Sequence, residues 1–390
     1  MSRILSASFV PALLAILALA PSASAQTDAK PANRVEWEGW KFNWSVRKRE
    51  ALVLTDVSFR GKSVLKYAGL AELLTAYDQG EPRPRDFEQG YEVITLKPGV
   101  DCSSGESCKV FNVDGKESGK DAQAQVMMHE ERTGPNYLGG FGRTPGKTLV
   151  LWMALRFTGG EDGYTFLVRW KFRDDGMLIP EVGATGVPQF LATGDSSPTG
   201  ALIGLKGKDK EKVFAPSHIH GFLYRLHFAI DGDENTVEEF NWDGDPKSGT
   251  AKCAWTPILK ETGRPGNRDT FRSWRVVNYK SKNALGLPRS YQLIPGATGV
   301  FRSAKKDEAT AKKDLWVTAF KPGETGGMDD LARYANDEPV KDKSVVVWYW
   351  LMMHHMPRAE DYLHQPIIWK SFELMPRDFL DTSPLIPGKK

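Results

Sequence analysis

The chain alternates between short segments in which apolar and polar residues take turns and loops rich in glycine, proline and charge. A period of two is typical of strands that bury one face. No segment keeps the 3.6-residue period of an amphipathic helix, and only Leu70–Ala76 suggests one or two helical turns. The pattern predicts strands over Val35–Phe42, Ala51–Phe59, Ser63–Tyr67, Thr148–Phe157, Tyr164–Phe172, Met177–Val182, Ser217–Phe228, Ser273–Asn278, Asp314–Phe320 and Ser344–Met353.

One predicted strand differs from the others, because Val345–Leu351 is apolar at every position. Such a run indicates a strand buried on both faces, between two layers. Neither an internal repeat nor a linker rich in proline, glycine and serine divides the chain. We therefore expect an all-β fold: a single large antiparallel β-sandwich with long loops over residues 35–390.

The first 25 residues have the features of a secretory signal peptide. Arg3 precedes the mostly apolar stretch Ile4–Ala20, and Ala23-Ser24-Ala25 is a small-x-small cleavage site. The mature chain is expected to begin near Gln26, with a disordered leader over residues 26–34, and to be secreted or periplasmic. No later stretch is apolar enough to span a bilayer. The net charge of +3 gives no indication of nucleic-acid binding.

The chain contains three cysteines. An oxidising compartment permits one disulfide between them. Cys102 and Cys108 bracket a loop of serine and glycine and are the favoured pair, which would leave Cys253 over. No two of the three have the Cys-x-x-Cys spacing of a metal site.

Candidate metal chemistry begins with His218 and His220, which share one face of a predicted strand. Two imidazoles at this spacing are good ligands for copper or zinc, although two histidines on a half-exposed strand would look the same. A third imidazole from His354 or His355, at the end of another strand, would complete a three-histidine site with an open position. Catalytic metals use such sites. The remaining histidines fit surface or capping roles better: His129, His227 and His364.

Several stretches of the chain, in order, resemble the catalytic domain of the copper amine oxidases, the enzymes that contain topaquinone. The resemblance covers roughly residues 35 to 385, without the family's smaller N-terminal domains. The family's His-x-Pro-Arg pattern selects His355 over His354 as the third copper ligand, beside His218 and His220. The matching stretches are Ser217–His220 with Arg225-Leu226, Trp274–Asn278, Lys282–Pro288, Tyr291–Leu293, Asp314–Thr318, and Val345–Tyr349 with His355–Asp361.

The resemblance assigns the family's quinone-forming tyrosine to Tyr164, which stands six residues before Trp170, as it does in the family. In the family this tyrosine lies in an Asn-Tyr-Asp/Glu-Tyr sequence. Here Gly163 replaces the asparagine, Thr165 the acid and Phe166 the second tyrosine. Tyr164 is therefore the expected topaquinone precursor, with neighbouring residues that differ from those of the family. The alternative is an ordinary, unmodified tyrosine in a sheet.

Two more residues take roles from the resemblance. Asp86, which follows a proline-rich loop, matches the catalytic base, with Glu88 as the alternative. A loop carboxylate after a proline turn, with no catalytic role, would have the same sequence context. Tyr77 matches the tyrosine that hydrogen-bonds the quinone.

The resemblance implies a secreted, homodimeric oxidase that holds copper and topaquinone. It would convert a primary amine, small or peptidyl, together with dioxygen and water, into an aldehyde, ammonia and hydrogen peroxide. A quinone supplies the electron sink that standard side chains lack, and Asp86 would remove the proton from the carbon bearing nitrogen. Two alternatives stay open: a copper-binding β-sandwich that does not form the quinone, and a secreted zinc hydrolase that uses the same three histidines.

Overall fold

The computed structural model describes residues 33–78, 84–85, 87, 90–102, 107–115, 125–140, 142–157, 163–197, 200–245, 247, 250–296, 299–301, 305–323 and 327–385. The expected signal peptide and most of the expected leader lie outside these residues. The leader prediction is wrong for Asn33 and Arg34, because both pair with β2 as part of the first strand.

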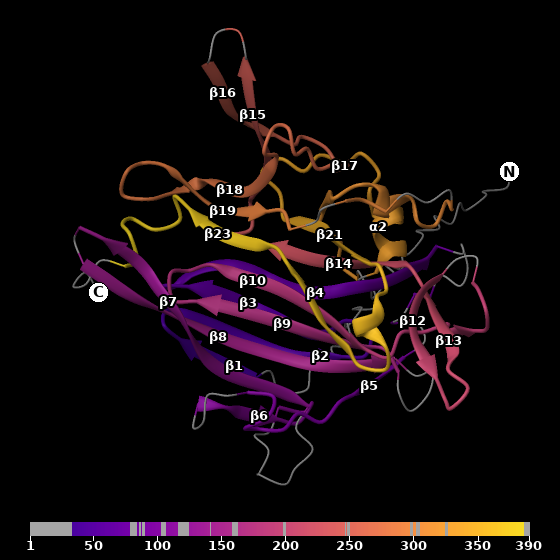
Figure 1. Cartoon of the computed structure of the whole chain (residues 1–390). Helices are drawn as coiled ribbons and strands as arrows, with labels where there is room; N and C mark the ends of the chain where they lie inside the picture. The colour runs from indigo at the N-terminus through magenta and orange to yellow at the C-terminus, as the bar shows by residue number, and fades with distance from the viewer. Residues whose placement is uncertain are drawn as a thin grey trace, which may run out of the picture.

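Antiparallel strands in two large sheets and one small sheet make up most of the described chain (Figure 1). The first large sheet contains, in spatial order, β1 (Asn33–Trp37), β2 (Trp40–Arg47), β3 (Ala51–Phe59), β4 (Lys62–Tyr77), β14 (His218–Phe228), β21 (Val345–His355), β20 (Leu315–Ala319) and β17 (Thr262–Arg264).

The second large sheet contains more strands than the first. Its spatial order is β16 (Thr250–Pro257), β15 (Thr236–Asp245), β18 (Ser273–Lys282), β19 (Pro288–Ile294), β23 (Glu373–Arg377), β10 (Leu178–Gly186), β9 (Thr165–Arg173), β8 (Gly142–Phe157), β7 (Val126–Gly139) and β6 (Lys109–Phe111). Two shorter pairings branch from this order: β22 (Gln365–Ser371) with β10 and β5 (Tyr91–Val93) with β8.

The small sheet and the helical segments are short and lie outside the two large sheets. The small sheet consists of β11 (Ala192–Thr193), β13 (Glu211–Pro216) and β12 (Gly200–Lys206). The helical segments include α2 (Met328–Tyr334) and the 3-10 turns η2 (Ala309–Lys312) and η3 (Ala359–Asp361). Among the described residues, no helix has the length and apolar character needed to cross a bilayer.

Both large sheets contribute to one hydrophobic core, so they form the two layers of a sandwich. Phe42 of β2 stacks on Phe172 of β9, with the ring centroids 4.1 Å apart. The buried indole nitrogen of Trp170 on β9 donates a hydrogen bond to the Leu52 carbonyl of β3, at 3.0 Å. The expected antiparallel all-β sandwich is confirmed.

The helical turns expected at Leu70–Ala76 are wrong, because this segment lies within β4. Leu73 packs in the core between the large sheets, whereas Leu74 packs in a second apolar cluster. A strand buried on both faces is apolar throughout and loses the period of two that identifies strands in a sequence. Pairing with β14 along the segment, and a bridge between Leu74 and Arg85, override the helix propensity of alanine, leucine and glutamate.

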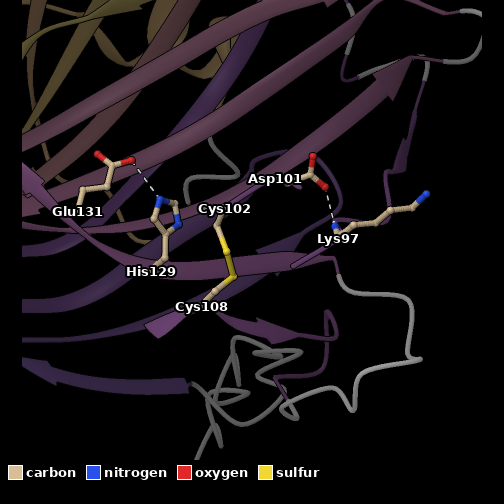
Figure 2. Close-up of a disulfide and its surroundings, with 6 residues drawn as sticks. All are labelled: Lys97, Asp101, Cys102, Cys108, His129 and Glu131. Carbon is tan, nitrogen blue, oxygen red and sulfur yellow. Dashed lines mark hydrogen bonds and ion pairs between the residues drawn. A yellow bond between two sulfur atoms is a disulfide. The ribbon is translucent and has the colours of Figure 1, made fainter. Parts of the chain in front are cut away.

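The disulfide expected between Cys102 and Cys108 is present (Figure 2). Cys102 is buried in a small apolar cluster with Met127 of β7 and Trp152 of β8. The cross-link therefore fastens a loop against the second large sheet, close to His129 in Figure 2.

Candidate metal centre

The central position of β14 in the first sheet brings the candidate ligands together. His218 lies opposite Tyr77 on β4 and opposite His355 on β21. His220, two residues further on, shares the face of His218. Of the two consecutive histidines on β21, His354 is exposed to solvent and His355 is buried. The structure thus favours His355 over His354 for a buried site, as the sequence pattern indicated.

Tyr164 immediately precedes β9 of the second sheet, and its hydroxyl oxygen lies between the three imidazoles. The distance from this oxygen is 3.1 Å to His220 Nε2, 3.3 Å to His355 Nδ1 and 3.5 Å to His218 Nε2. The tyrosine is only 3% exposed. One sheet therefore supplies the imidazoles and the other supplies the phenol.

The hydrogen bonds at the far side of the His218 and His355 rings show which nitrogen of each ring carries a proton. His218 Nδ1 lies 3.1 Å from the Pro216 carbonyl oxygen, which can only accept, so Nδ1 is the donor. His355 Nε2 lies 3.0 Å from a carboxylate oxygen of Asp361. The Asp361 side chain is fully buried, and its carboxylate oxygen likewise accepts a hydrogen bond from the ring.

His220 follows the same arrangement, with its Nδ1 3.1 Å from the Thr75 hydroxyl. When Nδ1 of His220 carries the proton, the converging Nε2 keeps a lone pair. The three nitrogens that face the Tyr164 oxygen are then all bases. His218 Nε2 and His355 Nδ1 are only 3.2 Å apart, so two lone pairs face each other across a short gap.

The chemistry of these donors suits a metal ion, although no three His, Cys, Asp or Glu side chains among the described residues are already arranged as a metal site. Two ligands about 2.0 Å from one ion in tetrahedral geometry are about 3.3 Å apart, close to the separation between His218 and His355. Three neutral imidazoles suit copper or zinc. The imidazoles do not enclose an empty cage, because the Tyr164 oxygen lies between them. An ion held there would meet that oxygen at once.

Burial keeps the imidazoles in the form that binds metal. Burial, with a smaller contribution from the neighbouring His355, lowers the pKa of His218 to about 4. Burial also lowers the pKa of His220 well below its usual value. Both rings are therefore neutral at pH 7, as a metal ligand must be.

Tyr77 packs at the edge of this cluster. Its ring lies 5.0 Å from the His218 ring and 4.8 Å from the ring of Phe190, centroid to centroid. Tyr77 is buried, whereas Phe190 is about half exposed. The structure thus brings Tyr77, a predicted site residue, beside the candidate ligands.

The predicted base Asp86 and its alternative Glu88 both lie outside the described residues. Their neighbours are described. The Arg85 side chain pairs with the buried carboxylate of Glu72 at 2.8 Å. Phe87 packs edge-on against Phe157, at 5.9 Å. The assignment of the base stays a prediction.

Gly163, which stands where the family has asparagine, has no room for a side chain. A Cβ atom there would lie 2.7 Å from the Phe157 carbonyl oxygen. Real Cβ atoms do not approach backbone so closely, so the altered residue before Tyr164 matches the local backbone. Phe166, in place of the second tyrosine, packs on the rings of both Tyr164 and His220, each at 5.1 Å.

The surface positions expected for the other histidines are partly wrong. His364 is exposed, as expected. His129 is buried on β7 rather than in a loop and bonds Glu131 at 3.1 Å. His227 is buried near the far end of β14. His227 lies in a strand whose two faces are covered, which periodicity does not reveal.

Three residues of the site were not identified from the sequence: Thr75, Asp361 and Gln365. Thr75 and Asp361 hold the far nitrogens of His220 and His355, and Gln365 Nε2 donates to the Tyr164 oxygen at 3.0 Å. Asp361 was within a matching stretch, six residues after His355, and a search for carboxylates beside the ligands would have found it. No sequence signal marks Thr75 or Gln365.

Buried imidazoles from one sheet around a tyrosine from the other define a candidate metal–tyrosine centre in a β-sandwich. Comparison with known proteins indicates the family of the chain. The profile of the copper amine oxidase enzyme domain matches residues 30–389. A primary amine oxidase of Arthrobacter sp. (strain P1) is 27% identical over 91% of this chain and 60% of its own. Primary amine oxidase 1 of Arabidopsis thaliana is 26% identical over 91% of this chain and 62% of its own.

A solved structure supports the same fold. The copper-containing benzylamine oxidase from Hansenula polymorpha superposes with a TM-score of 0.78, at 22% identity, over 90% of this chain and 61% of that one. The chain belongs to the copper amine oxidase family, which confirms the expected resemblance. It spans only about 60% of the length of these relatives.

Proposed function

We propose that this chain is an amine oxidase that uses copper and topaquinone. A primary amine, dioxygen and water would give an aldehyde, ammonia and hydrogen peroxide. The observation that carries the proposal is the convergence of three imidazole nitrogens, from His218, His220 and His355, on the buried oxygen of Tyr164.

The three histidines would hold copper, and Tyr164 would be the topaquinone precursor. Copper and dioxygen would oxidise the Tyr164 ring to a quinone, whose carbonyl is the electron sink that amine oxidation needs. Asp361, Pro216 and Thr75 would keep the three rings in the tautomers that present lone pairs. The burial of Tyr164 excludes bulk water from the reacting ring.

Two further residues have proposed roles in the reaction. Asp86, or Glu88 in its place, would take the proton from the carbon bearing nitrogen. Tyr77 would donate a hydrogen bond to the oxidised ring of Tyr164. Its position beside His218 supports this role.

The remaining proposals concern the whole protein. We propose that residues 35–390 form one domain, which the core shared by both large sheets supports. We propose a secreted or periplasmic homodimer, on the N-terminal sequence and the family resemblance. The substrate is proposed to be a small or peptidyl primary amine.

The second candidate function is a copper-binding scaffold that does not form the quinone. The altered residues around Tyr164 favour it: Gly163, Thr165 and Phe166. This candidate keeps the ligands and loses only the oxidation of the tyrosine.

The test is the mass of the peptide that contains Tyr164, from protein purified with copper under air. A gain of two oxygen atoms with a loss of two hydrogen atoms is expected. A Tyr164→Phe variant, which binds copper through the same histidines, is the control and should stay unmodified. Unmodified Tyr164 in protein that holds one copper per chain would exclude the oxidase and leave the scaffold.

A further inference from the structure

Gln365 reaches the centre from β22, a strand that carries no proposed ligand or catalytic residue. It is the first residue of β22 and is 3% exposed. Its amide nitrogen donates to the Tyr164 oxygen at 3.0 Å and lies 3.4 Å from the Ala184 carbonyl oxygen. The Ala184 carbonyl, which can only accept, fixes the amide orientation, because a carboxamide turned the other way would place its oxygen against that carbonyl.

The backbone holds Gln365 firmly in this place. The Thr185 hydroxyl donates to the Gln365 carbonyl at 2.7 Å. Gln365 pairs with Gly186 at the point where the register of β10 and β22 shifts. A Cβ atom on Gly186 would lie 2.7 Å from the Gly163 carbonyl oxygen, so the segment before Tyr164 lies directly against β10. The amide donor and the phenol are thus carried by two backbone segments that both contact β10.

The partners of the Tyr164 phenol oxygen include three imidazole nitrogens and one amide nitrogen. The converging nitrogens of His218, His220 and His355 are bases when the rings carry their protons on the far side. A base accepts a hydrogen bond and cannot hold a phenol that has lost its own proton. The Gln365 amide is a donor in every protonation state near neutral pH. It therefore stabilises the Tyr164 oxygen both as a hydroxyl and when that oxygen carries negative charge.

The side chain of the residue before Tyr164 cannot donate a hydrogen bond to the Tyr164 oxygen. Gly163 has no side chain, and the Phe157 carbonyl leaves no space for one. Ring packing by Phe166, at 5.1 Å, limits the tilt of the phenol but gives no polar contact to its oxygen. Neither of these two residues therefore supplies a side-chain donor to the Tyr164 oxygen.

We propose that Gln365 is a positioning residue whose amide N–H holds the Tyr164 oxygen between the three imidazoles and so sets how fast that ring is oxidised. This inference rests on the proposed function for its effect on oxidation. The hydrogen bond itself is independent of copper.

The first experiment follows oxidation of Tyr164 in the Gln365→Met variant, which keeps the length of the side chain and removes the donor. Metal-free protein receives one equivalent of copper under air, and the mass of the Tyr164 peptide is followed with time. Losing one neutral hydrogen bond should slow the conversion about fivefold, while copper stoichiometry stays at the wild-type value. Conversion at the wild-type rate would overturn the proposal.

The matched control is Gln292→Met. Gln292 is another buried glutamine, on β19, where it donates to Ser273 and accepts from Arg377. Its substitution removes comparable buried hydrogen bonds away from the centre. We expect it to leave the rate of Tyr164 conversion unchanged. A rate that falls equally in both variants would assign the effect to general destabilisation and overturn the positioning role.

A second measurement separates this inference from the proposed function. In metal-free protein with 13C at the tyrosine Cζ atoms, the Tyr164 signal is assigned by its loss in Tyr164→Phe. Because this atom carries the phenol oxygen, its chemical shift should change in Gln365→Met and stay constant in Gln292→Met. An unchanged shift in Gln365→Met would disprove the hydrogen bond. If wild-type protein binds copper and leaves Tyr164 unmodified, the proposed function fails, and this shift alone decides the role of Gln365.

Discussion

β14 carries buried histidines at its two ends, and they differ in what faces their ring nitrogens. At one end, His218 and His220 direct nitrogens toward the Tyr164 oxygen. At the other end, His227 bonds the Ser344 hydroxyl at 2.8 Å and stacks on Phe320, with the ring centroids 4.3 Å apart. Burial lowers the pKa of all three rings.

The comparison shows that a buried, neutral histidine is not by itself a metal ligand. His227 has both features and satisfies its ring within the fold. The rings at the other end differ because a partner holds each far nitrogen while the near nitrogens converge. Convergence and a fixed tautomer, rather than burial, define the candidate centre.

The largest effect should come from removing a ligand. We expect His220→Ala to bind copper at least about a hundredfold more weakly than the wild type, because one of three donors is lost. His227→Ala should still bind one copper per chain. Metal analysis and competition with a chelator measure both variants. An equal loss of copper in the two would show that the two ends of β14 do not differ as proposed.

The next effect concerns the carboxylate behind His355. Asp361→Asn keeps the shape of the side chain and removes its charge, so it should weaken copper binding by about 10–100-fold. Asp314→Asn is the matched control, since Asp314 is also a buried acid and bonds the Gly266 amide instead of a histidine. Chelator competition should show no change in the control. Wild-type affinity in Asp361→Asn would remove Asp361 from the centre.

A smaller effect is expected from filling the space at Gly163. Gly163→Ala places a Cβ atom against the Phe157 carbonyl, and the resulting backbone shift should lower the free energy of unfolding by about 1–3 kcal/mol. Gly140→Ala is the control, because nothing lies within 4 Å of a Cβ atom there. Denaturant unfolding compares the two variants. Equal stability would mean that the segment before Tyr164 accommodates a side chain without cost.

The smallest effect is a pH dependence at the far end of β14. Burial, with smaller effects from Lys66 and Arg225, lowers the pKa of His227 to about 4 in the folded protein. The unfolded chain takes up this proton near pH 6.5. His227 therefore contributes stability that is fully present above pH 6.5 and is lost as the pH falls toward 4.

The pH effect is isolated by comparing wild-type protein with His227→Gln, both loaded with copper. Between pH 7.5 and pH 4.5 the melting temperature of the wild type should fall about 2–4 °C further than that of the variant. The variant keeps a polar partner for Ser344 and lacks the titrating group. Parallel curves would show that His227 does not control this part of the stability.

The sequence predicted the sandwich and the residues that converge, but not the contacts that hold them. His218, His220 and Tyr164 were identified because strand periodicity and the family stretches specify position along a strand. The partners Thr75 and Gln365 were not, because each comes from a strand neighbour that only the three-dimensional register defines.

Periodicity also failed where strands are covered on both faces. Leu70–Ala76 resembled a helix, and His227 was expected near the surface, for the same reason. A strand inside a layered fold no longer alternates, so its sequence does not distinguish inner from outer positions. The base at Asp86 was assigned by resemblance and stays a prediction.

The division of the centre between the two sheets has a consequence for when the centre can form during folding. The imidazoles belong to the first sheet, and Tyr164 precedes a strand of the second. The phenol meets the imidazoles only when the two layers have packed. Under the proposed function, an unfolded or half-assembled chain would not acquire its quinone even where copper and oxygen are plentiful. An oxidised Tyr164 ring would then indicate that the chain had completed folding.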